Sequence, residues 1–322
     1  MNRLIRSLPI TSLAIVVGVV CFLSSMESQA QASNSYIVVD ANHKKILISN
    51  DADRKMPVAS LTKVATALVA LDWVYSKNGD KNAVMTVPQT VSALGGANPL
   101  GMQPGDRITV RDAVYAALMA SDNVSAHTLA EYFGWQMLPH VGGRDPMRAF
   151  VDQMNALAAS LGMSRTKFVN PHGLDHQGPV GTSTARDMAR LMIYGLRNPS
   201  FNFIVAQTSR EISYQRGGQS LGFTINNTNK LLGQYGIDGG KTGSTQRAGD
   251  CLITTARKPD RFVPVNATQK RRIPYRLVTV VLASPDRFGQ TAGLIQQGWT
   301  NYDAWVAGGM QVTQGEILTI AN

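Results

Sequence analysis

A serine and a lysine stand three residues apart at the start of the apolar segment PVASLTKVATALVAL, residues 57–71. Residues i and i+3 of a helix share a face, so the ammonium of Lys63 can reach the hydroxyl of Ser60. Burial lowers the pKa of a lysine, and a second cation nearby lowers it further. A neutral lysine can remove the proton of a serine hydroxyl. The pair therefore has the chemistry of a nucleophile and its general base.

Two more polar motifs follow this pair. The segment ALMASDNVSAH places Ser121 and Asn123 in a short loop between two predicted helices. The segment GIDGGKTGSTQRAGD places the run Lys241–Ser244 among glycines, just before a predicted strand. Gly243 would let a substrate backbone lie close to the edge of that strand.

Each motif is weak when taken alone. Ser164–Lys167 repeats the Ser-x-x-Lys pattern, and Ser76–Asn78 and Ser200–Asn202 repeat the Ser-x-Asn pattern, whereas Lys-Thr-Gly occurs once. The order and the intervals carry more information. The serine of the second motif follows Ser60 by 61 residues, and the lysine of the third motif follows after a further 120.

Elements from both ends of the chain would have to position these motifs. Alternation over Ser35–Asp53 predicts a hairpin, and strand-like segments return late as REISYQ, GDCLITTA and RLVTVVLAS. Helical spacing of apolar residues marks the centre: Thr109–Ala120, Val124–Gly134 and Asp145–Gly162. Thr184 and Asp187 have capping-box spacing before a further helix. We predict an α/β (α+β) fold, with a sheet from both chain ends packed with helices and an inserted, mostly helical subdomain.

The ordered set Ser-x-x-Lys, Ser-x-Asn and Lys-Thr-Gly is the signature of the penicillin-recognising serine enzymes. From about residue 36 to 305 the sequence resembles the low-molecular-mass penicillin-binding proteins, the serine-type D-alanyl-D-alanine carboxypeptidases. The phrases FVNPHGLD, TSTARDMARLM and NNTNKLL are similar to connecting segments of that family. The resemblance implies a β-lactamase/transpeptidase-like fold, with an antiparallel sheet, for a catalytic domain over residues 33–305.

The resemblance also implies a role for each residue of the three motifs. The implied catalytic residues are Ser60, Lys63 and Ser121. The implied substrate-binding residues are Asn123, Lys241, Thr242, Gly243 and Ser244. Ser60 would be acylated, Lys63 would be the base kept neutral by burial and by Lys241, and Ser121 would relay a proton to the leaving amine. Asn123 would bond the substrate and orient the base, and the backbone N–H groups of Ser60 and Ser244 would form the oxyanion hole.

The implied reaction removes the terminal D-alanine from a peptidoglycan stem peptide through an acyl-enzyme, and β-lactam antibiotics would acylate the same serine. No metal or organic cofactor is implied. A D,D-endopeptidase that cleaves peptidoglycan cross-links stays open. After Trp305 the chain continues as a short tail, residues 306–322, too few for the C-terminal β-domain of many family carboxypeptidases, which favours the endopeptidase somewhat.

Other enzyme classes fit less well. A class A β-lactamase would add Glu-x-x-Leu-Asn, and none of the four glutamates has an asparagine four residues later. Gly218–Gly222 fits Gly-x-Ser-x-Gly, but FTINNTNK follows it instead of a helix, so a hairpin turn is expected. His172 and His176 have the spacing of zinc ligands, yet Pro171 and Gly173 argue against a regular helix there.

A non-enzymatic role, as a penicillin-binding sensor or a cell-wall scaffold, is the remaining alternative. A sensor would need a transmembrane segment and an output domain, and no second apolar span follows the N-terminal one. A scaffold would have no need to keep all the residues of the three motifs. Both points favour an enzyme.

The N-terminus has the layout of a secretory signal peptide. Arg3 and Arg6 precede the apolar run Leu8–Leu23, and small-residue sites would allow cleavage after Ala30 or Ala32. We expect residues 1–32 to direct export to the periplasm or cell envelope of a bacterium.

The charge balance suits a protein of that compartment. Loss of residues 1–32 would lower the formal net charge from +10 to +9, which suits an anionic cell wall or membrane surface. Nucleic acid is disfavoured by the export signal, and the run Lys270–Arg272 is expected to be a solvated turn. The mature chain would keep one cysteine, Cys251, in a buried-strand pattern.

Overall fold

The computed structural model describes residues 34–320 except 142, 177 and 267. The predicted signal peptide, residues 1–32, lies outside the described residues. Among the helices of this described part, none combines the length and the hydropathy that crossing a bilayer requires.

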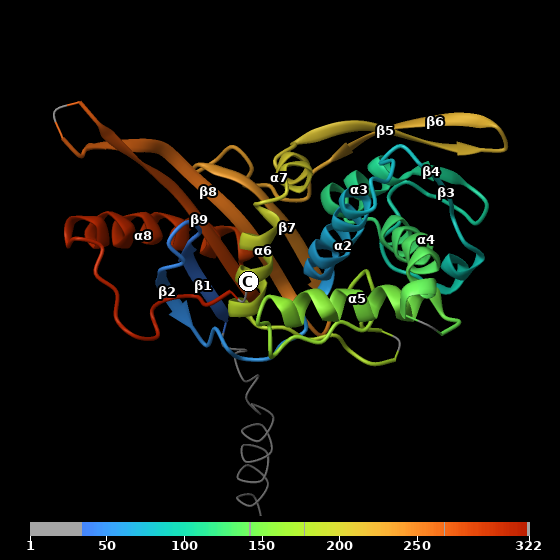
Figure 1. The fold of residues 1–322 in the computed structure, drawn as a ribbon. Helices are drawn as coiled ribbons and strands as arrows, with labels where there is room; N and C mark the ends of the chain where they lie inside the picture. Colours follow the sequence, from blue (N-terminus) through green and yellow to red (C-terminus); the bar gives the residue numbers. More distant parts are fainter. Residues whose placement is uncertain (1–33, 142, 177, 267, 321–322) are drawn as a thin grey trace, which may run out of the picture. The chain divides into compact units, whose positions relative to one another are not determined.

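The main sheet is built from both ends of the described chain, as the sequence predicted. Its five strands are antiparallel neighbours in the order β2-β1-β9-β8-β7. Their bounds are β1 Ser35–Asp40, β2 Ile46–Asn50, β7 Ile237–Thr245, β8 Gly249–Pro264 and β9 Lys270–Ser284. The two outer strands are thus β2 and β7, and β7 carries the Lys-Thr-Gly motif (Figure 1).

Each face of the sheet buries alternate strand residues against helices, because successive side chains of a strand point to opposite faces. Val38 belongs to the core under α8, Arg287–Ala307, together with Trp299 and Tyr302 of that helix. Ile37 and Val39 belong to the larger core, which they share with α6, Ala185–Gly195. The strand β7, which carries Lys241–Ser244, therefore belongs to a sheet that is covered on both faces.

Most helices lie between β2 and β7 in the sequence, and α2–α5 gather beside the β7 edge (Figure 1). The helices of this insertion are η1 Ala59–Leu61, α2 Thr62–Ser76, η2 Gln89–Ala93, α3 Val110–Met119, α4 Asn123–Val141, α5 Pro146–Ser160, α6 and α7 Pro199–Val205. Every residue of α2 from Thr62 to Leu71 is buried. A helix that is apolar on all sides must be a core helix, and α2 is the one that the other helices surround.

The helix boundaries follow the predicted capping signals. Thr184 accepts a hydrogen bond from the backbone N–H of Asp187 at 3.0 Å, which confirms the predicted start of α6. Asp145 caps α5 in the same way, with Pro146 in the first turn. Gly162, at φ +72°, follows the end of α5 and takes a left-handed conformation that favours glycine.

A second sheet, of order β3-β4-β5-β6, was not expected. It joins the short strands β3 Val84–Thr86 and β4 Arg107–Thr109 to the hairpin of β5 Ser209–Arg216 and β6 Gln219–Asn226. The Gly-x-Ser-x-Gly segment lies in this hairpin, so the expected hairpin is confirmed.

The predicted turn at Lys270–Arg272 is wrong. These residues begin β9, because Pro264 pairs with Lys270 and Phe262 with Arg272 across the ladder. The reversal of the chain lies between Pro264 and Lys270 instead.

Candidate active site

Ser60 sits in the short turn η1, immediately before α2. Ala59, the residue before it, has φ +47°, which is costly for a residue with a Cβ. The segment around Gly173 packs tightly against this turn: a Cβ on Gly173 would lie 1.9 Å from the carbonyl oxygen of Ala59. The strained turn is thus held from outside, and it fixes where the Ser60 hydroxyl points.

Lys63 is fully buried and its Nζ has three oxygen neighbours. They are Oγ of Ser60 at 2.8 Å, Oδ1 of Asn123 at 2.7 Å and the carbonyl oxygen of His172 at 2.8 Å. Burial lowers the pKa of Lys63 to about 7, and the Asp122 carboxylate opposes this shift. In the neutral form, the amine can donate to Asn123 and His172 and turn its lone pair to Ser60.

From the sequence, we expected the charge of Lys241 to lower the pKa of Lys63. In the structure, Lys241 is not among the causes of the lowered pKa. Burial alone accounts for the lowered pKa of Lys63. For Lys241, burial comes first, and the positive charges of Lys63 and Arg287 then lower its pKa further, well below the ordinary range.

Ser121 stands between α3 and α4 with φ +60°. The Nζ of Lys241 lies 2.8 Å from its Oγ and also donates to the carbonyl oxygen of Thr242 at 2.8 Å. The two motifs that are 120 residues apart in the chain thus meet through one hydrogen bond.

Asp122 caps α4, so its two neighbours in the motif, Ser121 and Asn123, do not serve as the helix cap. Its Oδ1 accepts the backbone N–H of Ser125 at 2.6 Å, and burial raises its pKa. Capping by Ser121 or Asn123 would be the simple structural explanation for polar residues at a helix start. Since Asp122 takes that position, Ser121 and Asn123 are free to contact the two lysines.

The Lys-Thr-Gly strand passes directly beside the serine. A Cβ on Gly243 would lie 3.1 Å from the backbone nitrogen of Ser60 and 3.0 Å from the carbonyl oxygen of Val58. The lack of a side chain therefore lets β7 approach η1. Thr242 is buried and its Oγ1 donates to Oγ1 of Thr228 at 2.6 Å, whereas Ser244 is exposed.

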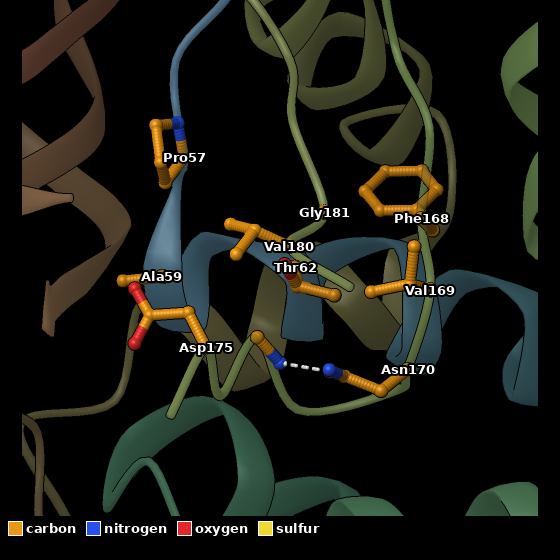
Figure 2. A pocket seen from close by; sticks show the side chains of 10 residues that line it. Pro57, Ala59, Thr62, Phe168, Val169, Asn170, Asp175, Val180 and Gly181 are labelled. Carbon is orange, nitrogen blue, oxygen red and sulfur yellow. Dashed lines mark hydrogen bonds between the residues drawn. The ribbon is translucent and has the colours of Figure 1, made fainter. Parts of the chain in front are cut away.

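A loop behind the serine presents the third oxygen to Lys63. Asn170 Oδ1 accepts the backbone N–H of Gly173 at 2.7 Å, and its Nδ2 donates to the carbonyl oxygen of Leu174 at 2.8 Å. Figure 2 shows this loop facing Ala59 and Thr62 across a small pocket. The resulting tight turn holds the His172 carbonyl oxygen against Nζ of Lys63.

Arg287 at the start of α8 is a site residue that the sequence did not reveal. Its Nη1 donates to the carbonyl oxygen of Gly243 at 2.9 Å and to Oδ1 of Asp250 at 3.2 Å. It adds a cation beside β7. The only sequence signal was an arginine after a strand, and this signal is too common to be informative.

Several other side chains singled out in the sequence are not part of this cluster. His172 contributes only its carbonyl oxygen: its imidazole is buried and stacks on that of His127 at 6.1 Å between ring centroids, and burial holds its pKa well below the ordinary value. Within the described residues no group of three or more His, Cys, Asp or Glu side chains could hold a metal ion. Cys251 is buried in β8, which raises the pKa of its thiol to about 11.

Known proteins resemble this chain in sequence and in fold. The family model described as peptidase S11, D-alanyl-D-alanine carboxypeptidase, matches residues 23–267. A D-alanyl-D-alanine endopeptidase of Pseudomonas aeruginosa is 34% identical over 247 residues, covering 75% of this chain and 74% of that protein. The D-alanyl-D-alanine carboxypeptidase DacB2 of Mycobacterium tuberculosis is 34% identical over 230 residues, covering 71% and 72%. The crystal structure of a D-alanyl-D-alanine carboxypeptidase from Mycobacterium tuberculosis superposes with a TM-score of 0.65 at 30% identity, covering 83% of this chain and 90% of that one.

Proposed function

Because the chain belongs to the peptidase S11 family, it is a serine-type D-alanyl-D-alanine carboxypeptidase, and we propose that Ser60 is its nucleophile. Ser60 attacks the carbonyl carbon of the penultimate D-alanine of a peptidoglycan stem peptide. The bond to the terminal D-alanine breaks, and water then hydrolyses the ester on Ser60. A β-lactam antibiotic acylates the same oxygen and leaves it slowly.

Lys63 acts as the general base of the acylation step in this proposal. Its support is the set of three contacts to Ser60, Asn123 and the His172 carbonyl oxygen, all shorter than 3 Å. With a pKa of about 7, a large share of Lys63 is neutral at neutral pH and can accept the Ser60 proton. These three contacts of Lys63 are the observation on which we base the assignment of Ser60 as nucleophile and Lys63 as base.

Ser121 and Lys241 deliver a proton to the leaving amine. The Ser121 hydroxyl accepts from Lys241, so its own proton is free to point toward the substrate nitrogen. After the transfer, Ser121 is reprotonated through the lysines. The amide of Asn123 bonds the substrate backbone and keeps Lys63 oriented.

The terminal carboxylate of the substrate lies along β7. Thr242 and Ser244 contact it, Lys241 holds Ser121 and the Thr242 carbonyl oxygen in place, and Arg287 makes the strand positive. Gly243 lets the peptide approach the strand edge, since β7 pairs only with β8 within the described residues. The backbone N–H groups of Ser60 and Ser244 stabilise the oxyanion, where one donor is worth about 100- to 1000-fold in rate.

Covalent labelling tests the nucleophile. The wild-type protein should gain one acyl group from penicillin, seen by intact mass, and release D-alanine from a pentapeptide. Ser60→Ala should do neither, and a control variant, Ser164→Ala, should behave as the wild type, since Ser164 lies in the other Ser-x-x-Lys segment. Continued labelling of Ser60→Ala would refute the assignment.

A D,D-endopeptidase activity is the second candidate, since the Pseudomonas aeruginosa relative carries that name at 34% identity. It uses the same acyl-enzyme with a different leaving amine. Purified cross-linked peptidoglycan fragments separate the two: loss of one alanine indicates a carboxypeptidase, and cleavage of the dimer indicates an endopeptidase.

The working place of the enzyme is the bacterial envelope. We propose that residues 1–32 are a cleaved signal peptide and that the catalytic domain, residues 33–305, acts in the periplasm or at the cell wall. The formal net charge of +10 supports a peripheral contact with the wall or the membrane.

A further inference from the structure

The last part of the β8–β9 hairpin extends beyond the rest of the sheet. β7 pairs with β8 only as far as Ala256, and β1 pairs with β9 only as far as Leu277. Beyond these positions the two strands continue as a two-stranded extension, residues 257–276, whose register runs out to Pro264 and Lys270. Figure 1 shows this extension projecting past the other strands. We call it the projecting hairpin.

The projecting hairpin holds much of the positive charge of the chain. Its cationic residues are Arg257, Lys258, Arg261, Lys270, Arg271, Arg272 and Arg276. Asp260 is its one acidic residue, so its formal net charge is +6, against +10 for the whole chain. Asp238 and Asp303 from neighbouring elements pair with its base, which leaves +4 when both are included.

Apolar side chains stand at the far end of the projecting hairpin. The sequence Phe262–Val265 reads FVPV. Phe262 is 61% exposed and Val265 is 60% exposed. A phenylalanine left in water forgoes the free energy of burial, so two exposed apolar side chains at one tip, beside cations, indicate a contact surface.

The base of the projecting hairpin is firmly attached to α8. Lys258 lies 4.8 Å from the ring centre of Trp299 and pairs with Asp303 at 3.3 Å. Tyr275 packs on the same helix, with its ring centroid 4.7 Å from that of Tyr302, and its hydroxyl accepts a hydrogen bond from Arg261 at 3.1 Å. A two-stranded hairpin is only marginally stable by itself, and these contacts hold it in one direction. The tip is therefore presented away from the sheet.

The tip is too far from the active site to serve it directly. Lys241 pairs with Ile253 on β8, and Pro264 lies eleven residues further along that strand. At about 3.3 Å per residue, the separation is roughly 36 Å. The cations of the tip therefore need another partner than the substrate at Ser60.

We propose that the tip, residues 261–266 and 268–272, docks on the surface of an anionic phospholipid membrane. Arg261 and Lys270 contact the headgroup phosphates, and Phe262 and Val265 enter the apolar layer beneath them. A dissolved polyanion would contact the cations alone and leave both apolar side chains in water, so the pairing of the two kinds of group favours a bilayer. This inference rests on the proposed envelope location and is independent of the chemistry at Ser60.

Vesicle binding tests the proposal. The chain from Ser33 onward, which contains the whole compact unit that begins at Asn34, is sedimented with vesicles of phosphatidylglycerol and phosphatidylcholine or of phosphatidylcholine alone. We expect binding to the anionic vesicles only, weakening with added salt. The double variant Arg261→Gln, Lys270→Gln should weaken it roughly 30-fold, and Phe262→Ser with Val265→Ser about tenfold or more.

Matched substitutions elsewhere serve as controls. Lys55→Gln with Lys230→Gln removes two exposed charges, and Phe203→Ser removes a ring that is 55% exposed. These variants should bind vesicles as the wild type does. Penicillin labelling of each tip variant should equal that of the wild type, which shows that the fold is intact.

Three outcomes would overturn the proposal. In the first, the wild type binds vesicles equally well with and without the anionic lipid. In the second, the tip variants bind as well as the wild type. In the third, the wild type binds soluble poly(glycerol phosphate) but does not bind vesicles. Loss of penicillin labelling in the wild type would instead count against the proposed function and would leave the vesicle result standing.

Discussion

Among single residues, Lys63 is the proposed general base, and its pKa gives the pH range in which we expect acylation. In this proposal the acylation rate depends on the fraction of Lys63 that is neutral, and burial lowers the pKa of Lys63 to about 7. We therefore expect the second-order rate of penicillin acylation to rise about tenfold per pH unit below this pKa and to level off above it. Stopped-flow acylation over a pH series measures the profile. A constant rate from pH 5 to 9 would contradict a base with this pKa.

The charge of Arg287 should matter for substrates with a free carboxylate. Arg287→Gln removes a cation that donates to the Gly243 carbonyl oxygen at 2.9 Å. A hydrogen bond to a charged group contributes enough that kcat/KM for a pentapeptide should fall about 10- to 100-fold. The same peptide with an amidated C-terminus should lose much less. Equal losses for both peptides would indicate a structural role for Arg287 instead. Arg257→Gln, on the projecting hairpin, is the control for a lost surface charge.

On the scale of elements, the position of Ser60, the proposed nucleophile, depends on the fit between the loop Asn170–Leu174 and the turn η1. Gly173 has φ +80°, and a Cβ there would lie 1.9 Å from the Ala59 carbonyl oxygen. Gly173→Ala should therefore displace η1 and greatly reduce penicillin acylation. Gly178→Ala is a matched control, because Gly178 has φ +71° and open space around it.

The two glycine variants separate the clash from the backbone strain. Both replace a glycine at positive φ and incur a similar conformational cost. Gly173→Ala should lower the free energy of unfolding by about 1–3 kcal/mol more than Gly178→Ala, as overpacking does. Chemical denaturation measures the difference. Similar stability and acylation of the two variants would show that η1 tolerates the contact.

The elements also show what a sequence can and cannot reveal. α3, α5 and the late strands were predictable, because their apolar periodicity and caps are local. The strands Val84–Thr86 and Arg107–Thr109 were not, since three residues give no period: these strands are defined by pairing with each other and, for Arg107–Thr109, with β5. The motif residues were found by their order, whereas Arg287 and the His172 carbonyl reach the site through tertiary packing alone.

For the molecule as a whole, the two outer strands of the main sheet have different surroundings. β7 lies beside η1 and carries Lys241–Ser244. The start of β2 is covered by the segment Glu316–Leu318: Ile46 donates its N–H to the Glu316 carbonyl oxygen at 2.7 Å, and Leu318 donates its N–H to the Lys44 carbonyl oxygen at 2.8 Å. Lys45 and Glu316 form an ion pair across the same junction. Covering the start of β2 shortens the edge at which another strand could pair, whereas the β7 edge lies at the proposed substrate site.

The stability of this cover can be measured through Leu318, which is fully buried in the larger core. Leu318→Ala should lower the free energy of unfolding by about 2–5 kcal/mol, since it leaves a cavity where the chain end meets the sheet. Val312, which is 47% exposed, is the control, and Val312→Ala should change stability by less than about 0.5 kcal/mol. Penicillin acylation of the folded Leu318→Ala protein should match that of the wild type, because β2 and β7 are separated by the three central strands. Equal stability of the two variants would mean that the chain end adds little to the sheet, and the protection of β2 would then have to come from its own exposed polar side chains.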